Sequence, residues 1–381
     1  MSFSRIQYQS SAVRMLRAAV AGDRVPHAYL FVGPRGVGKG LAARELAKLL
    51  FCESHVGADA QDLDPCDMCD RCRRVDRDVH PDLHWFRKEA DRNDFRLCLV
   101  ARRDGSPDAV VIESVILTPM EAPVTVTVLD DAELLNAAAA NALLKTLEEP
   151  SPHAVLILLC ADASRLPGTI LSRCQWVRFR PLPAEFVAEK VREVLAARTR
   201  QEADKGNQGE QTEPVSAEEI AFVCRFAGGS IERAAGLAGS GLWDLKQQLV
   251  AGLPEINAAA ALALAEAIRE WGRAVARREH VKRDTPEANA VRRRSARLGL
   301  AAVASAFGDA ALLAARGDAA GRLVNADQRG EIEALATWPA ETCARAVGLL
   351  ADGQAQIGRY VHTELAAENA LIQVSRLRPS M

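Results

Sequence analysis

Short apolar runs alternate with helical stretches in the first half of the chain. The runs Ala28–Val32, Val124–Leu129 and Ala154–Cys160 are bounded by turn signals and predict buried strands. Each run is followed by a segment with helical spacing of apolar residues, such as Leu41–Phe51 and Leu134–Leu147. Strands that alternate with helices in this way predict an α/β fold, in which helices cover both faces of a parallel sheet.

The remainder of the chain is predominantly helical in its patterning. A helix is predicted over Pro183–Ala197, followed by a mobile polar loop at Thr199–Pro214 and a new helix with its N-cap at Ser216. From about residue 241 the chain is rich in Ala and Leu and predicts a helical bundle. We therefore expect three domains: residues 1–181, 182–240 and 241–381.

One segment inside the first domain departs from this picture. The stretches Phe95–Ala101 and Ala109–Leu117 flank the turn-forming sequence Asp104–Asp108. β-branched and aromatic residues on both sides of such a turn predict a hairpin.

Composition narrows the functional classes. The 381 residues are 49% hydrophobic and 26% charged, which excludes wholesale disorder, and the net charge of -2 argues against DNA binding through the chain's own surface field alone. We find no run of about 18 apolar residues and no apolar core of a signal peptide near the N-terminus. We therefore expect a cytoplasmic protein without a membrane span, whose cysteines are buried thiols or metal ligands.

A phosphate-binding loop is predicted directly after the first apolar run. Gly33, Gly36 and Gly38 allow backbone N–H groups to turn towards phosphate groups, and Lys39 can reach the terminal phosphates. The residue after this lysine normally supplies a hydroxyl ligand to Mg²⁺, but here it is Gly40. The loop therefore has the pattern of a nucleotide site that lacks one metal ligand.

An acidic pair follows the predicted strand Val124–Leu129. Asp130 is the candidate Mg²⁺ carboxylate, and Asp131 stands where active ATPases of this type place a Glu that orients water. An acidic helix N-cap is the alternative interpretation of this pair. Because both the hydroxyl and the longer acid are missing, the site has the pattern of an eroded ATPase, and the sequence leaves open whether ATP with Mg²⁺ still binds.

Four cysteines form a candidate metal site. Cys52, Cys66, Cys69 and Cys72 have the spacing C-x13-C-x2-C-x2-C, which can close a tetrahedral sulfur shell around Zn²⁺. Four protein ligands leave no open position, so the predicted role of the zinc is structural. Free or redox-active thiols are the alternative, and His55 and His80 are alternative ligands.

Two further segments identify a family. Asn141–Pro150 reads NALLKTLEEP, and Leu166–Cys174 ends in Ser172-Arg173-Cys174. Together they closely resemble the clamp-loader branch of the AAA+ ATPases. The resemblance implies a RecA-like AAA+ domain with a zinc-binding insert at about residues 52–72, a small helical lid domain and an all-helical collar domain. It also implies that the chain works with other clamp-loader subunits in a five-membered ring, which loads a sliding clamp onto primer–template DNA.

The resemblance also implies roles for individual residues. Arg173 would be an arginine finger directed at the ATP of a neighbouring subunit, and Arg233, in Gly228–Arg233, would be the second sensor of the degenerate nucleotide site. Gly40, Asp131 and the pair Cys160-Ala161 at the first sensor favour a stationary subunit over an active ATPase motor subunit, which is the main alternative. A zinc-dependent nucleic-acid-binding module that uses the basic stretch Arg273–Arg297 is the second alternative.

Overall fold

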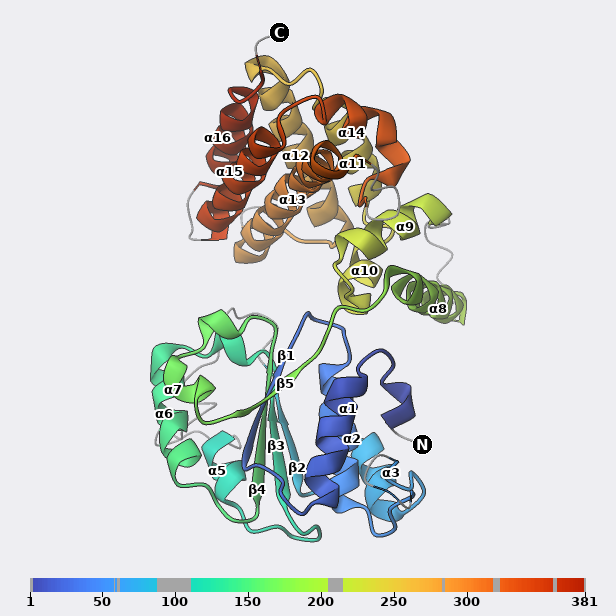
Figure 1. Cartoon of the computed structure of the whole chain (residues 1–381), viewed down its shortest axis with the longest axis vertical. Helices are drawn as coiled ribbons and strands as arrows, with labels where there is room; N and C mark the ends of the chain where they lie inside the picture. The colour runs from blue at the N-terminus through green and yellow to red at the C-terminus, as the bar shows by residue number, and fades with distance from the viewer. Residues whose placement is uncertain are drawn as a thin grey trace. The chain divides into compact units, whose positions relative to one another are not determined.

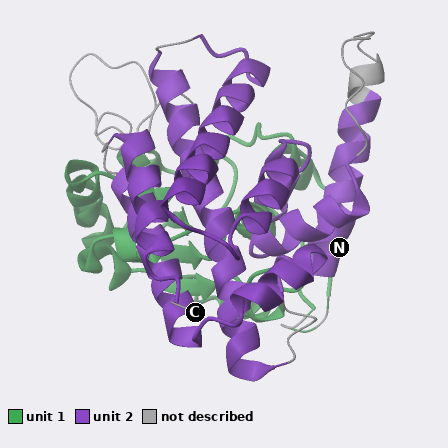
Figure 2. Cartoon of the chain, turned by 90° about the horizontal axis from the view of Figure 1, so that it is seen from above, with its two compact units in different colours: residues 1–182 green, residues 183–381 purple. Residues whose placement is uncertain are grey.

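The chain folds into two compact units, residues 1–182 and 183–381 (Figure 2). The computed structural model describes residues 3–57, 59, 62–87, 111–204, 215–282, 285–317, 323–358 and 362–379. Each unit has its own buried core: Leu30 and Leu158 are fully buried in the first, Val303 and Leu350 in the second.

A five-stranded parallel sheet forms the centre of the first unit. Its strand order is β2-β3-β4-β1-β5, and the paired strands run parallel throughout. The three predicted apolar runs form the three inner strands, which explains why they are mainly apolar and contain no charged residue. The strands are β1 (Ala28–Val32), β2 (Leu83–Phe86), β3 (Thr125–Leu129), β4 (Ala154–Cys160) and β5 (Gln175–Arg178).

Helices cover both faces of this sheet, which confirms the predicted α/β fold (Figure 1). One face carries α1 (Ser10–Ala21), α2 (Lys39–Phe51) and α3 (Asp70–Asp76). The other carries α5 (Val111–Ile116), α6 (Ala137–Glu148) and α7 (Gly168–Leu171). Single 3-10 turns lie at η1 (Phe3–Arg5), η2 (Ala132–Leu134) and η3 (Ala163–Arg165).

The predicted hairpin is wrong where it can be compared with the structure. Residues 111–116 form helix α5, not a strand, whereas Phe95–Ala101 lies outside the described residues. Val111, Ser114 and Val115 are buried at a spacing of three and four, so one side of this short helix packs towards the sheet. The β-branched residues favoured a strand locally, but the packing against the sheet decides the conformation.

The described residues of the second unit form helices joined by turns and loops, with no strand among them. Long helix α13 packs against α11, α12, α14, α15 and α16. Ser216 caps α9 as predicted, since its Oγ accepts the N–H of Glu219 at 3.0 Å. The helices are α8 (Ala184–Asp204), α9 (Ala217–Phe226), α10 (Ile231–Leu237), α11 (Leu242–Ala251), α12 (Ala258–Arg278), α13 (Pro286–Arg316), η4 (Ala326–Gln328), α14 (Arg329–Leu335), α15 (Ala340–Gly358) and α16 (Thr363–Ser375).

Two features of this unit differ from the expectations. Helix α8 continues to Asp204, through the first residues of the predicted loop, and residues 205–214 of that loop lie outside the described ones. Helix α13 contains an 18-residue window long and apolar enough to cross a membrane, half of which is buried inside the unit. The helices that surround α13 account for this apolar composition, because the core helix of a globular unit has the same character.

Candidate functional site

The phosphate-type loop links the end of β1 to the start of α2, as its glycines predict. Gly36 and Gly38 have φ angles of 70° and 100°, which side chains rarely tolerate. Gly33 lies against Phe179, just beyond β5, where an added Cβ would come within 2.4 Å of a carbonyl oxygen. Each of these glycines is therefore required by the path of the backbone.

Lys39 folds back onto the loop that precedes it. Its Nζ donates to the carbonyl oxygens of Gly33 at 2.6 Å and Pro34 at 2.7 Å, and the residue is only 8% exposed. Burial lowers the pKa of Lys39, while the nearby carboxylates of Glu133 and Asp130 raise it. The Lys39 ammonium group is therefore hydrogen-bonded to backbone carbonyl oxygens of its own loop.

Trp85 lies beside Gly40, the residue that replaces the expected metal-binding hydroxyl. A Cβ atom added to Gly40 would lie 3.6 Å from the Trp85 ring, which comes from strand β2. The guanidinium groups of Arg87 and Arg44 lie over the same indole, 5.1 Å and 5.7 Å from its centroid. Sequence reasoning missed Trp85 because its strand carries no strong apolar pattern.

The acidic pair lies beside this loop, at the end of β3. The Asp130 carboxylate accepts the N–H of Asp131 at 3.1 Å and forms an ion pair with Arg87 at 3.5 Å. Asp131 has a left-handed φ of 57°, a conformation that Asp tolerates better than most residues. Its Oδ1 lies 2.5 Å from the Nη2 of Arg35, which belongs to the phosphate-type loop.

Glu133 extends this connection to the sheet. One carboxylate oxygen lies 3.7 Å from Arg35, and the other accepts the N–H of Ala161, directly after β4, at 3.1 Å. Burial, followed by the charge of Glu133, raises the pKa of the neighbouring Cys160 to about 12. Arg35 and Glu133, which sequence reasoning missed, thus tie the loop, the acidic pair and the first-sensor position together.

The structure brings the four predicted cysteines together. Their Sγ atoms all lie within 4.8 Å of one another. Sulfur atoms about 3.8 Å apart follow from a tetrahedral site with Zn–S distances of about 2.3 Å, so the cluster fits such an ion. The N–H of Cys66 points at the Sγ of Cys52, and that of Cys69 at the Sγ of Cys66, both at 3.3 Å. This four-cysteine cluster could hold a metal ion.

The two alternative histidine ligands have other contacts. His55 Nε2 lies 2.8 Å from the carbonyl oxygen of Leu49. The buried ring of His80 stacks on Phe51 at 4.4 Å, and its Nδ1 accepts the N–H of Asp82 at 3.2 Å. Among the described residues, the candidate metal-binding group therefore consists of the four cysteine thiols, without either histidine.

Lys48 attaches this cluster to α2. Its ammonium group is 1% exposed and lies 2.5 Å from Asp67, 3.1 Å from Asp76 and 3.3 Å from Glu45. Burial lowers the pKa of Lys48, but the hydrogen bonds to Asp67 and Asp76 and the charge of Glu45 outweigh it and raise the pKa overall. Asp67 lies between Cys66 and Cys69 in the sequence, and Asp76 ends α3, the helix that contains Cys72. One buried cation thus holds the insert in place.

The predicted finger residue lies between α7 and β5. The guanidinium of Arg173 is bound on its own chain by the carboxylate of Glu148 at 2.7 Å and the carbonyl oxygen of Thr169 at 2.9 Å. About a third of the Arg173 side chain, 34%, stays exposed. Arg233, the predicted second sensor, belongs to the other unit, where it lies in the first turn of α10 over the ring of Phe226 at 5.4 Å.

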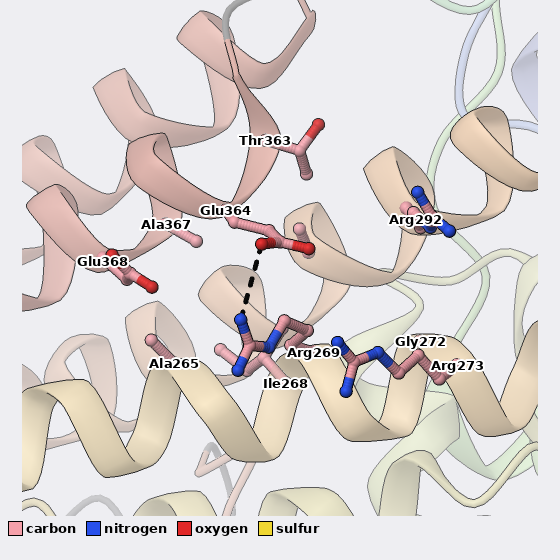
Figure 3. Close-up of a pocket in the computed structure, with 11 residues that line it drawn as sticks. Ala265, Ile268, Arg269, Gly272, Arg273, Arg292, Thr363, Glu364, Ala367 and Glu368 are labelled. Carbon is pink, nitrogen blue, oxygen red and sulfur yellow. Dashed lines mark hydrogen bonds and ion pairs between the residues drawn. The ribbon is translucent and has the colours of Figure 1, made fainter. Parts of the chain in front are cut away.

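A shallow pocket opens between α12, α13 and α16 of the second unit (Figure 3). Arg269 lies at its centre and forms ion pairs with Glu364, at 3.5 Å, and with Glu266. Arg273 is paired with Glu270 at 2.6 Å. Acidic neighbours neutralise these two arginines, so the pair offers little net positive charge to a polyanion.

Comparison with known proteins finds sequence similarity in the first unit. Residues 8–183 match the family described as DNA polymerase III, delta subunit. The DNA polymerase III subunit delta' of Bacillus subtilis is 33% identical over 185 residues, which cover 49% of this chain and 51% of that protein. The Escherichia coli subunit tau is 30% identical over 194 residues, covering 51% of this chain and 28% of that protein. The chain thus spans about half the length of the first relative, and less of the second.

Two solved structures resemble the chain more distantly. A DNA polymerase III gamma subunit-related protein of Thermotoga maritima aligns over 97% of this chain and all of its own, with 15% identity and a TM-score of 0.36. The clamp loader delta protein of B. subtilis aligns over 96% of this chain and 99% of its own, with 10% identity and a TM-score of 0.28. The sequence matches confirm the predicted resemblance to clamp-loader proteins for residues 8–183.

Proposed function

We propose, from the match of residues 8–183 to the DNA polymerase III delta-subunit family, that this chain is the delta-prime subunit of a bacterial clamp loader. In this role it joins gamma/tau and delta subunits in a five-membered cytoplasmic ring that loads the sliding clamp onto primer–template DNA. Residues 182–240 are proposed as the lid domain and residues 241–381 as the collar through which the ring assembles. The sequence match to a B. subtilis delta' subunit supports this proposal.

The subunit is proposed to be stationary and to hydrolyse little or no ATP itself. One observation carries this proposal: Asp131, in the position of the acid that orients water, is bound to Arg35 at 2.5 Å. A carboxylate paired with an arginine is a poor acceptor for a water proton. Gly40 offers no hydroxyl to Mg²⁺, and Trp85 lies against it. The remains of an ATP site are then proposed at Gly33, Gly36, Gly38, Lys39, Asp130 and Asp131. Arg233, in the other unit, keeps the proposed role of second sensor.

The four-cysteine cluster is proposed to hold one structural Zn²⁺ through Cys52, Cys66, Cys69 and Cys72. Four thiolates are the ligand set of many closed zinc sites, and the sulfur atoms are close enough to share one ion. The metal would stabilise an insert that has little apolar core of its own.

Arg173 is proposed to act on the ATP of a neighbouring subunit. An arginine supplied in trans stabilises the charge of a transferring phosphoryl group and is worth about 10³ to 10⁵ in rate in nucleotide hydrolases. The Ser172-Arg173-Cys174 sequence and the exposed third of the Arg173 side chain support this role. Lys cannot reproduce the planar guanidinium, so Arg173→Lys should also be defective.

The test uses the complex reconstituted from this chain, gamma/tau and delta. Arg173→Ala should leave folding, metal content and ring assembly intact while lowering clamp- and DNA-stimulated ATP hydrolysis and clamp loading. Wild-type rates in that mutant complex would rule out the trans-acting role.

An active motor subunit is the second candidate, favoured by the 30% identity to subunit tau. The isolated chain distinguishes the two candidates. A motor subunit hydrolyses ATP in a reaction that Lys39→Ala abolishes, whereas a stationary subunit shows only background phosphate release.

A further inference from the structure

Two helix ends hold the guanidinium group of Arg173 from different sides. Glu148, the last residue of α6, accepts from Nη2 at 2.7 Å. Nη1 donates to the carbonyl oxygen of Thr169 in α7 at 2.9 Å and to the hydroxyl of Ser172 at 3.4 Å. Both terminal nitrogens, Nη1 and Nη2, are hydrogen-bonded. The contacts therefore fix the orientation of the guanidinium plane as well as its distance from the backbone.

The elements that carry these contacts are themselves firmly anchored. Leu143 and Leu147 of α6 and Ile170 of α7 are buried in the core of the first unit. The indole N–H of Trp176, on β5, donates to the carbonyl oxygen of Leu171 at 3.0 Å and closes the segment after α7. Glu148 therefore reaches Arg173 from a fixed helix end, and the arginine lies on a short, tightly held turn.

We propose that Glu148 is a positioning residue for Arg173 in the trans-acting role described above, on which this inference rests. A guanidinium has five N–H donors, and three hydrogen bonds to its own chain leave others for an oxyanion on a neighbouring subunit. A group already held in its working orientation loses no further freedom when charge develops on that oxyanion. Glu148 thus contributes to the neighbour's reaction without touching its substrate.

The Arg173–Glu148 ion pair is partly exposed, so its effect on catalysis can be measured separately from its effect on folding stability. Both side chains are partly exposed, Arg173 by 34% and Glu148 by 52%. Exposed ion pairs contribute little to folding, so the fold should tolerate loss of the carboxylate. The exposed Glu149 directly follows Glu148 and supplies a matched control with the same charge at nearly the same place.

The experiment measures clamp- and DNA-stimulated ATP hydrolysis of the reconstituted complex with five variants of this chain, one of which is Arg173→Ala. Glu148→Ala should lower kcat about tenfold with KM for ATP unchanged, because the finger loses orientation and no substrate contact is removed. Glu148→Gln retains an oxygen acceptor and should lie closer to wild type. Glu149→Ala should match wild type, and Glu148→Ala combined with Arg173→Ala should be no worse than Arg173→Ala alone. Thermal unfolding of each variant confirms that it is folded.

Several outcomes would overturn the inference while leaving the proposed function standing. These are a wild-type or higher kcat for Glu148→Ala in a complex that Arg173→Ala impairs, or effects of the two substitutions that add. An equal loss in Glu148→Gln and Glu148→Ala would likewise point to local charge instead of orientation. If Arg173→Ala itself has no effect, the proposed finger role fails first, and the inference falls with it.

Discussion

Arg35 of the phosphate-type loop lies 2.5 Å from the carboxylate of Asp131, on the acidic motif that follows β3. In an active nucleotide hydrolase the loop and the motif meet through the phosphates and their metal ion. Here two side chains of the chain itself make that connection, and Glu133 adds a third at 3.7 Å from Arg35. Ion pairs within the chain therefore join the loop to the acidic motif directly.

The isolated chain should release phosphate from ATP no faster than background. Gly40→Thr alone should not restore turnover, because the added hydroxyl supplies one metal ligand while Asp131 stays paired with Arg35. A phosphate-release assay with and without Mg²⁺ measures this, with Lys39→Ala as the reference. Vigorous hydrolysis that depends on Lys39 would contradict the expectation.

The Arg35–Asp131 pair should show a small, salt-sensitive coupling. A double-mutant cycle with Arg35→Ala and Asp131→Asn, followed by urea unfolding, should give about 0.5 to 1 kcal/mol, because Arg35 is about half exposed, at 47%. High salt should reduce this value. Arg14→Ala, an exposed substitution on α1, serves as the control. Strictly additive effects would show that the two residues are not coupled.

Purified protein should contain one Zn²⁺ per chain. Cys69→Ser should remove most of the metal, since three thiolates bind zinc far less tightly than four, and should loosen the insert while the sheet stays folded. Cys343→Ala, in the second unit, should keep the full metal content. Elemental analysis of the three proteins decides the matter, and substoichiometric zinc in the wild type would count against the site.

Asp82 should make stability depend on acid. Its carboxylate is 2% exposed and accepts the N–H groups of Met120, Glu121 and Ala122 at 2.6, 2.9 and 2.8 Å. Burial raises the pKa of Asp82, but these three hydrogen bonds outweigh it and lower the pKa. The stabilisation is therefore complete above about pH 4, the value of an unfolded Asp, and is lost as pH falls towards the lower folded value.

Asp82→Asn tests this expectation. The amide replaces an acceptor oxygen by a donor, so the variant should lose about 1 to 3 kcal/mol at neutral pH. Its stability should also fall less steeply than that of the wild type between about pH 5 and about pH 3. Urea unfolding across this range provides the comparison, and parallel pH profiles would show that Asp82 is not responsible.

The sequence predicted the strands that are buried on both faces of the sheet and missed those at its edges. Strands β1, β3 and β4 are buried on both faces, so their residues are mostly apolar, with Thr125 and Thr127 of β3 as buried polar exceptions, and the runs are easy to identify. Edge strands β2 and β5 have four residues each and only partial burial, and their mixed composition gives no comparable signal. The segment of helix α5 is rich in Val and Ile, which favour strands, so its sequence predicts a strand. Its packing against the sheet makes it a helix instead.

The candidate site divides in the same way. The glycines, Lys39 and the four cysteines form local motifs whose spacing alone indicates their chemistry. Arg35, Trp85, Glu133 and Glu148 matter because of what lies beside them in space, and their partners are far away in the sequence or unrelated to any motif. No local pattern could have predicted these contacts.

Helix α2 begins at the phosphate-type loop with Lys39 and carries Lys48, which holds the cysteine insert, near its other end. The two lysines are nine residues apart in sequence, about 14 Å along a helix. Any energetic coupling that this helix carries between a ligand of the loop and a metal at the cysteines is reciprocal by thermodynamic necessity. Any ligand of the loop that shifts α2 must change the affinity for metal by the same factor by which the metal changes the affinity for that ligand.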